Sequence, residues 1–236
     1  MVFVPGGEFL RGRSHALPDD NLKWFPTLIK DDRPVRPVTV DPFYLDEHEV
    51  TNEQYAAFVQ ATKHRAPYNW PKGQVPEGKG KLPVVDVSWD DAVAYAQWAG
   101  KRLLTEAEWE RACRGLNVGK KYPWGDREPG KNDARFNTLD GPGEVCKFKA
   151  NYFGLYDMAG NVWEWCADWY EKDYYQRAAF RNPRGPETGM YRVLRGGSWA
   201  DVPKYLTCAY RSWARPAERS PNIGFRCAKS FRSGQP

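Results

Sequence analysis

Histidines and closely spaced cysteines are scarce in this chain of 236 residues. Only three histidines occur, at positions 15, 48 and 64, which makes a histidine-rich metal centre hard to build. The five cysteines, at positions 113, 146, 166, 208 and 227, include no pair with C-x-x-C spacing. The absence of this spacing disfavours a zinc ribbon or a thioredoxin-type site. Because the number of cysteines is odd, at least one thiol stays free even in an oxidising compartment.

Short catalytic motifs are missing as well. The chain has no G-x-S-x-G turn, no glycine-rich phosphate loop and no H-E-x-x-H pair, so three common enzyme signatures are absent. A small acidic group, Asp46, Glu47 and Glu49, is most simply a solvated strand end. His48 lies within this group, and we interpret it as an exposed histidine rather than a pH-sensitive group.

Long apolar runs and blocks of basic residues are also lacking. No apolar stretch approaches the roughly 20 residues that span a bilayer, so we predict no membrane span. The net charge is +5, but Lys and Arg are interleaved with Asp and Glu. Nucleic-acid binding needs a clustered basic stripe, so we predict no nucleic-acid partner. The N-terminal stretch breaks at Pro5-Gly6-Gly7, too early for a signal peptide, which leaves open a cytoplasmic protein or a trimmed secreted domain.

Aromatic and turn-forming residues are abundant. The chain contains 11 Trp, 19 Pro and 21 Gly, which favours a loop-rich fold whose core is filled largely by aromatic side chains. Residues 35–50 have the composition of strands, broken by Pro42. No shift in composition marks a domain boundary. We therefore predict a single α+β domain over residues 1–236, low in regular secondary structure.

Three helices are predicted from their first residues. Each begins with Ser or Thr at the N-cap, followed by apolar residues at helical spacing. The helices begin at Thr51, which has the Thr-x-x-Gln capping box, at Ser88 and at Thr105. Gly100 and Gly115 are expected to end the second and third helices.

Segment 195–227 indicates a binding surface. It runs from a Gly-Gly-Ser turn to Gly-Phe-Arg-Cys, with Trp, Tyr, Arg and Asp placed irregularly between them. Pro203, Pro216 and Pro221 each remove a backbone donor, which predicts a loop rather than a helix or regular strand. Aromatic and charged side chains on such a loop favour binding; the alternative is a structural cap over the core. Cys208, within the loop, is either a low-pKa nucleophile or, as we favour, half of a disulfide.

Segment 151–165 has the pattern of a metal site. Asp157 and Glu164 lie seven residues apart, with a turn at Gly160 and Asn161 between them. Such a turn points carbonyl oxygens into one hollow, and two carboxylates beside it complete an oxygen cage that suits Ca²⁺. The alternative is a turn whose carboxylates cap backbone amides and pair with arginine.

Seven stretches, in the same order along the chain, resemble motifs of the formylglycine-generating enzyme family, also called sulfatase-modifying-factor domains. They are VFVPGGEFLRG (2–12), PFYLDEHEVTNEQYAAFV (42–59), PVVDVSWDDAVAYAQWAGKRLLTEAEWERACRG (83–115), YPWGD (122–126), NYFGLYDMAGNVWEW (151–165), RVLRGGSW (192–199) and NIGFRC (222–227). The resemblance covers nearly the whole chain. It implies a single compact domain with a variant of the C-type-lectin fold, usually holding structural Ca²⁺.

The resemblance also implies which residues hold the ion. The side chains of Asp157 and Glu164 and the carbonyl oxygens of Gly160 and Val162 would form the Ca²⁺ site. A second and looser site of the family would fall near Asn137.

Cysteine positions carry over from the family only in part. Cys113 and Cys208 stand where family members with disulfides place one bridge. Cys227 lacks its family partner, because Ala96 occupies that place. We therefore predict that Cys227 is unpaired, unless one of the two remaining cysteines has replaced the partner.

The catalytic cysteine pair of the family is absent. Formylglycine-generating enzymes have two copper-binding cysteines after the Gly-Gly-Ser turn. In this chain those positions hold Asp201 and, allowing for a short gap, Leu206. Copper(I) selects thiolate sulfur, which neither residue supplies, so we expect no bound copper.

Two functions are consistent with these features. The first is a non-catalytic module that binds an unidentified protein or small molecule through loop 199–221, with the variable proteins of diversity-generating retroelements as one candidate class. The alternative is a metal-dependent oxidoreductase that uses the family pocket with altered ligands, Cys208, Asp201 and Tyr205. Rigid aromatic side chains offer contact area at low entropic cost. The residues predicted to line the binding surface are Trp163, Ser198, Trp199, Asp201, Tyr205, Tyr210, Trp213 and Arg215.

Overall fold

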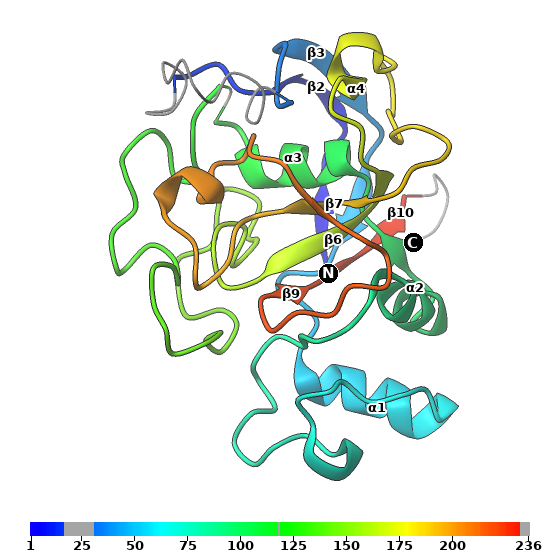
Figure 1. The fold of residues 1–236 in the computed structure, drawn as a ribbon. Coiled ribbons are helices and arrows are strands. Elements are labelled where there is room, and N and C mark those ends of the chain that lie inside the picture. Colours follow the sequence, from blue (N-terminus) through cyan, green and yellow to red (C-terminus); the bar gives the residue numbers. More distant parts are fainter. Residues whose placement is uncertain (17–30, 118, 232–236) are drawn as a thin grey trace.

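Short strands and a few helices, joined by long connections, make up the architecture (Figure 1). The computed structural model describes residues 1–16, 31–117 and 119–231, and the remainder of the predicted 1–236 domain lies outside the described residues. The strands are β1 (Val2–Val4), β2 (Gly7–Arg11), β3 (Arg36–Val40), β4 (Phe43–Leu45), β5 (Arg102–Leu103), β6 (Trp163–Trp169), β7 (Arg192–Arg195), β8 (Ser212–Ala214), β9 (Ile223–Gly224) and β10 (Cys227–Ser230). The helices are α1 (Asn52–Thr62), α2 (Trp89–Trp98), α3 (Glu106–Arg114) and α4 (Tyr174–Arg177), with 3₁₀ turns η2 (Pro71–Gly73) and η3 (Pro203–Leu206).

The strands form two small sheets and one separate pair. The first sheet has the order β1-β4-β10-β5, the second has the order β8-β7-β6-β9, and β2 pairs with β3. Neighbouring strands are antiparallel except β6 and β9, which run parallel. The predicted strand region 35–50 contains β3 and β4, and Pro42 lies in the break between them. The first strand and the last strand therefore meet in one sheet, on either side of β4.

Each of the three predicted helices begins with a complete capping box. In each box, the side chain of the N-cap residue accepts a hydrogen bond from the backbone N–H three residues later. The side chain of that later residue accepts one from the backbone N–H of the N-cap residue. The N-cap residues are Thr51, Ser88 and Thr105. Helix α3 ends at Gly115 as predicted, with φ 57°, a conformation that costs glycine little. Helix α2 has Ala99 at its C-cap, and Gly100 follows with φ 66°, the position at which glycine commonly ends a helix. Within the described ranges, none of the helices has both the length and the apolar character that a membrane span requires.

Helix α3 carries two buried glutamates that tie it to distant parts of the chain. Glu106 accepts hydrogen bonds from Arg11 on β2 and from Arg211, each at 2.6 Å. Glu110 accepts one from Arg195 on β7 at 2.8 Å. All five side chains are buried. Removing one partner of a buried pair costs about 3–5 kcal/mol. These bonds therefore hold β2, β7 and the residue before β8 against the helix.

Aromatic side chains fill much of the core, as the composition predicts. Between α1 and α2, Tyr55 stacks on Tyr95 with ring centroids 5.7 Å apart. Phe225, just after β9, contacts Tyr95 edge-on at 5.4 Å. Trp109 on α3 is fully buried and packs in a second cluster with residues of β1 to β4. These rings connect helices to sheets that are too short to form a continuous layer.

Segment 195–227 is more regular than its prolines predicted. It contains η3, β8 and β9, so the prediction of a loop without regular elements is wrong for these residues. Pro203 begins η3, a position where a missing N–H is tolerated. Strands β8 and β9 contain no proline and pair with β7 and β6. In Figure 1 the segment forms the orange turn and then runs back along the second sheet to β9.

Candidate functional site

The candidate binding surface begins where β7 ends. Gly196 and Gly197 have φ angles of 103° and 75°, which glycine adopts without a steric penalty. A Cβ atom on Gly197 would lie 3.0 Å from both Leu206 Cδ1 and the Tyr205 carbonyl oxygen. Glycine at position 197 therefore allows Tyr205 and Leu206 to pack closely against the backbone of the turn. Gly196 and Gly197 together set the direction in which loop 199–221 leaves β7.

Ser198 and Asp201 close a tight turn at the start of the loop. The Ser198 N–H and hydroxyl donate to Asp201 Oδ2 at 2.9 and 2.5 Å. The Asp201 N–H donates to the Ser198 carbonyl at 3.1 Å. One oxygen of the Asp201 carboxylate thus stabilises the loop itself.

Three aromatic residues form a continuous cluster beside this turn. The Tyr210 ring lies 4.8 Å from that of Tyr205 and 6.2 Å from that of Trp163, centroid to centroid. Burial, followed by the neighbouring Tyr205, raises the pKa of Tyr210 above its usual range, so its hydroxyl stays protonated. Half-buried Trp199 donates from Nε1 to the Pro221 carbonyl at 3.3 Å, which ties the first residue of the loop to the last.

Asn222 connects the turn with the aromatic cluster. Its carbonyl accepts the Trp163 N–H at 2.8 Å, and its side chain donates to the Ser198 hydroxyl at 3.4 Å. Six of the eight residues predicted for the binding surface therefore lie together: Trp163, Ser198, Trp199, Asp201, Tyr205 and Tyr210.

Trp213 and Arg215 lie apart from that group. Trp213 is an exposed residue of β8 and stacks on Tyr170 with ring centroids 4.3 Å apart. The Arg215 guanidinium lies 5.9 Å from the Tyr191 ring. These two residues extend the surface along the outer strand of the second sheet instead of joining the aromatic cluster.

Cys113 and Cys208 are joined by a disulfide with an S–S distance of 2.01 Å and Cα atoms 5.7 Å apart. The bond links the end of α3 to the middle of the loop. Cys146, Cys166 and Cys227 are free, the last two being buried. Burial is the main cause that raises the pKa of Cys146 to about 11 and that of Cys166 well above its usual range. These thiols therefore stay protonated near neutral pH.

Comparison with known proteins identifies the family. The model of the sulfatase-modifying factor enzyme 1-like domain matches residues 1–231. The chain belongs to this family. It is 39% identical over 98% of its length to the serine/threonine-protein kinase pkn1 of Chlamydia caviae, and it spans 38% of the length of that relative. It is 38% identical over 97% of its length to the formylglycine-generating enzyme of Streptomyces coelicolor, of which it covers 88%.

A solved structure of similar fold supports the same assignment. Treponema denticola variable protein 1 matches with a TM-score of 0.78 at 26% identity, over 98% of this chain and 95% of that chain. The predicted fold class, a single compact α+β domain of the formylglycine-generating-enzyme type, is confirmed.

The positions of the family's copper-binding cysteines hold no thiol. Leu206 is fully buried and packs with Tyr122 and Ala159, while Asp201 is bonded to Ser198. Cys208, the one sulfur of loop 199–221, is bonded to Cys113. The three altered ligands considered from the sequence therefore include no free thiolate.

The family's Ca²⁺ site would fall around Asp157. Its Oδ2 accepts the Cys146 N–H at 2.8 Å. The second predicted carboxylate, Glu164, is engaged by other groups. Arg226 donates to both of its oxygens at 2.8 to 3.0 Å, and Trp109 Nε1 donates to Oε2 at 2.9 Å. The alternative considered from the sequence, carboxylates that cap amides and pair with arginine, thus describes these hydrogen bonds.

Glu49 is the residue of this region that the sequence interpretation missed. It is fully buried, and neither carboxylate oxygen has a hydrogen-bond donor among the described residues. The interpretation as a solvated strand end is wrong for Glu49, and His48 is half-buried rather than exposed. Burial and then repulsion from Asp157 raise the pKa of Glu49 well above its usual range. The available signal was its position directly before Val50 and the cap Thr51, where the chain passes from β4 into α1.

The charges around Glu49 match a divalent cation. Three carboxylates, of Glu49, Asp157 and Glu164, interact electrostatically here with one guanidinium, that of Arg226. When all are ionised, the excess is two negative charges. A buried carboxylate without donors is costly, and hard oxygen ligands of this kind suit Ca²⁺. The residues therefore fit the ion that the family implies.

Backbone oxygens would have to complete any such site. In the part of the chain that the structure describes, no group of three or more His, Cys, Asp or Glu side chains is placed to hold a metal. Gly160 has φ 80°, and a Cβ there would lie 2.4 Å from the Arg135 carbonyl oxygen. Val162, the other predicted carbonyl ligand, is fully buried directly before β6. Asn137 is exposed, and its N–H donates to the Asp201 carbonyl at 3.0 Å.

Proposed function

We propose that this domain is a non-catalytic module that binds a protein or small-molecule ligand through loop 199–221. The observation that carries the proposal is that loop 199–221 offers no free thiol. Asp201 and Leu206 stand where the family's enzymes bind copper, and Cys208 is held in a disulfide. Because copper(I) selects soft thiolate ligands, the loop lacks the donors that the family's oxidation requires.

The surface of the loop suits recognition. Tyr205, Tyr210 and Trp199 are half-buried rings whose backbones are fixed by η3, the disulfide and the Ser198–Asp201 turn. Rigid rings of this kind contribute large contact areas at low entropic cost. The similarity to Treponema denticola variable protein 1 supports a binding role. An imperfect, adenine-rich copy of the 3′ end of the gene beside it is expected if this chain is a retroelement variable protein.

Structural Ca²⁺ is part of the proposal. The ion would be held by the side chains of Asp157 and Glu164 and by the carbonyl oxygens of Gly160 and Val162. Glu49 would add a negative charge, and its carboxylate oxygens accept no hydrogen bond among the described residues. The bound ion would supply the positive charge that this buried group of carboxylates lacks. Arg226 already balances the charge of Glu164, so the ion would balance the charges of Glu49 and Asp157.

Catalysis is tested directly with a cysteine-containing sulfatase peptide. We expect no aldehyde by mass spectrometry when the purified protein is incubated with copper(I) and the peptide, and we expect calcium but no tightly held copper or iron by elemental analysis. Conversion of the peptide, or stoichiometric copper or iron, would instead support the oxidoreductase alternative.

Binding is tested with arrays of peptides and glycans. Hits of the wild-type domain should disappear with Tyr210→Ala and persist with Tyr152→Ala, a change of an exposed tyrosine outside the loop. Circular dichroism checks that both variants fold. Hits that survive Tyr210→Ala and Trp199→Ala alike would place the binding surface elsewhere.

A further inference from the structure

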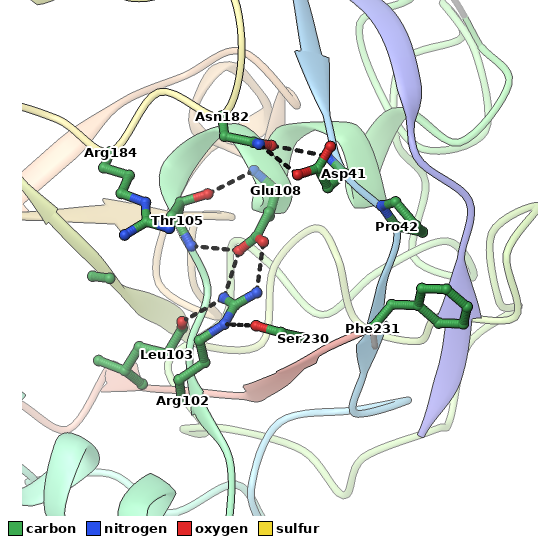
Figure 2. Close-up of a pocket in the computed structure, with 11 residues that line it drawn as sticks. Asp41, Pro42, Arg102, Leu103, Thr105, Glu108, Asn182, Arg184, Ser230 and Phe231 are labelled. Carbon is green, nitrogen blue, oxygen red and sulfur yellow. Dashed lines mark hydrogen bonds and ion pairs between the residues drawn. The ribbon is translucent and has the colours of Figure 1, made fainter. Parts of the chain in front are cut away.

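A cavity of about 480 Å³ lies away from loop 199–221, near the end of β10 (Figure 2). Its volume is in the range of small-molecule sites, about 300–1,000 Å³. Five separate parts of the chain form its walls: the break between β3 and β4, the β5–α3 corner, Ala167 of β6, the stretch after α4, and the end of β10. The residues that line it include Asp41, Arg102, Thr105, Glu108, Arg184 and Phe231.

The acidic groups in the cavity are already neutralised. Arg102 donates to both oxygens of Glu108, each at 2.7 Å, and its Nε donates to the Ser230 hydroxyl at 3.0 Å. Asp41 pairs with Arg181 outside the cavity and accepts a hydrogen bond from Asn182 Nδ2 at 2.7 Å. Neither carboxylate is therefore left to compensate a further cation.

Arg184 is the cation that remains. Within the described ranges it makes no hydrogen bond or ion pair, and no dashed line reaches it in Figure 2. The uncompensated charge among the lining residues is therefore a single positive one. An incoming ligand is favoured if it carries one negative charge.

The backbone that carries Arg184 is held in place on both sides. Asn182 Oδ1 accepts the Asp41 N–H at 2.8 Å, and the Asn182 N–H donates to the Thr39 carbonyl at 2.8 Å. On the other side, a Cβ on Gly185 would lie 2.9 Å from Asp168 Cβ. The guanidinium therefore projects from a fixed segment, which lowers the entropic cost of holding a ligand.

The opposite wall is aromatic. Phe231 is 38% exposed, and its ring is contacted by Phe3 and Tyr44 at centroid distances of 5.6 and 6.1 Å. Pro42 and Leu103 add apolar surface to the lining. A ligand that reaches Arg184 with an anionic group can thus pack an apolar body against Phe231.

We propose that this cavity is a second binding site, for a small monoanionic carboxylate with a compact apolar or aromatic body. Arg184 binds the carboxylate, the Ser230 and Thr105 hydroxyls can donate to it, and Phe231 contacts the apolar part. Loop 199–221 contributes no lining residue, so this inference stands independently of the binding role proposed for the loop.

The test is an NMR titration of the ¹⁵N-labelled domain with sodium benzoate. Benzyl alcohol supplies the ring without the charge, acetate supplies the carboxylate without the ring, and phenyl phosphate tests a phosphate ester in its place. We expect saturable shifts at amides of residues 102–108 and 182–185 with benzoate, and weaker binding of the other three probes. Because Arg184 is exposed, added salt should weaken the binding.

Variants of Arg184 test whether its guanidinium binds the carboxylate. Arg184→Gln should weaken benzoate binding about fivefold or more, the effect of roughly 1 kcal/mol, whereas Arg184→Lys should retain most of it. Arg127→Gln is the matched control, because Arg127 is an exposed arginine paired with Asp133 that does not line the cavity. The proposal is overturned if benzoate produces no saturable shifts, if benzyl alcohol or phenyl phosphate binds as well, or if Arg184→Gln binds like the wild type.

Discussion

Arg226 and Glu164 form an ion pair that is sealed from solvent. The Arg226 Nη2 atom lies 2.8 Å from Glu164 Oε1, and the two side chains are 0% and 1% exposed. Arg226 also donates to the carbonyl of Tyr156 at 2.8 Å. This guanidinium therefore joins the segment after β9 to β6 and to the turn that precedes the candidate Ca²⁺ site.

Replacement of Arg226 by Gln should be strongly destabilising. It leaves Glu164 buried without its counter-charge, and breaking a buried pair costs about 3–5 kcal/mol. Urea denaturation at pH 7 measures the loss. Arg127→Gln, which breaks an exposed pair with Asp133, is the control and should leave the midpoint unchanged. A wild-type midpoint in Arg226→Gln would show that the pair contributes little.

Calcium should stabilise the protein more at pH 7 than at pH 5. The pKa values of Glu49 and Asp157 are raised, mainly by burial, so the apoprotein loses stability as pH rises from the usual carboxyl range through the raised values. The ion binds the ionised forms, and its gain therefore grows with pH. At a concentration 100 times Kd the gain is about 2.7 kcal/mol, measurable as a rise in Tm.

The variant Glu49→Gln isolates the contribution of Glu49 to this pH-dependent stabilisation by Ca²⁺. This variant should be more stable than the wild type at pH 7 in EDTA, because it buries no charge, and should gain less from Ca²⁺. Equal responses of both proteins to Ca²⁺ at pH 5 and pH 7 would contradict a role for Glu49 in binding the ion.

Asp168 should lower the free energy of unfolding as the pH rises through 7. Its Oδ2 accepts the Glu106 N–H at 2.8 Å, while Oδ1 has no donor among the described residues. Burial, followed by repulsion from Glu106, raises its pKa from 3.8 to about 7. The folded state thus resists ionisation of Asp168, and the stability it contributes below the usual pKa is lost as pH rises through 7.

The variant D168N removes this titration. Its unfolding free energy relative to the wild type should rise by roughly 2–4 kcal/mol between pH 4 and pH 8, measured by urea denaturation at several pH values. A difference that stays constant with pH would show that Asp168 titrates at its ordinary value.

Removal of the disulfide should destabilise the domain. Cys113 and Cys208 are 95 residues apart, and loss of a native bridge typically costs about 2–5 kcal/mol. The double variant C113A/C208A avoids an unpaired buried thiol. Its Tm should be lower than that of the wild type and insensitive to dithiothreitol, whereas the wild type should lose stability on reduction. A wild-type Tm that dithiothreitol does not change would contradict this role.

Local signals in the sequence predicted the helices well. A capping box is completed within four residues, so Thr51, Ser88 and Thr105 identify their helix starts without any knowledge of the fold. Pro42 likewise marks the break between two strands, because a missing N–H acts locally. The prolines of segment 195–227 misled. Strand β8 forms between Pro203 and Pro216, and β9 forms after Pro221, where the backbone N–H groups can pair.

The sequence by itself determined the family, the helix starts and the absence of free sulfur at the copper-binding positions, because each depends on residue identity at short spacing. The tertiary structure alone decided that Glu49 is buried without a donor, that Trp213 and Arg215 diverge from the aromatic cluster, and that Arg184 faces a cavity. Those features arise where segments distant in the sequence meet, 108 residues apart for Glu49 and Asp157 and 43 for Trp213 and Tyr170. Burial and pairing of a charge depend on all of its neighbours, which no local pattern specifies.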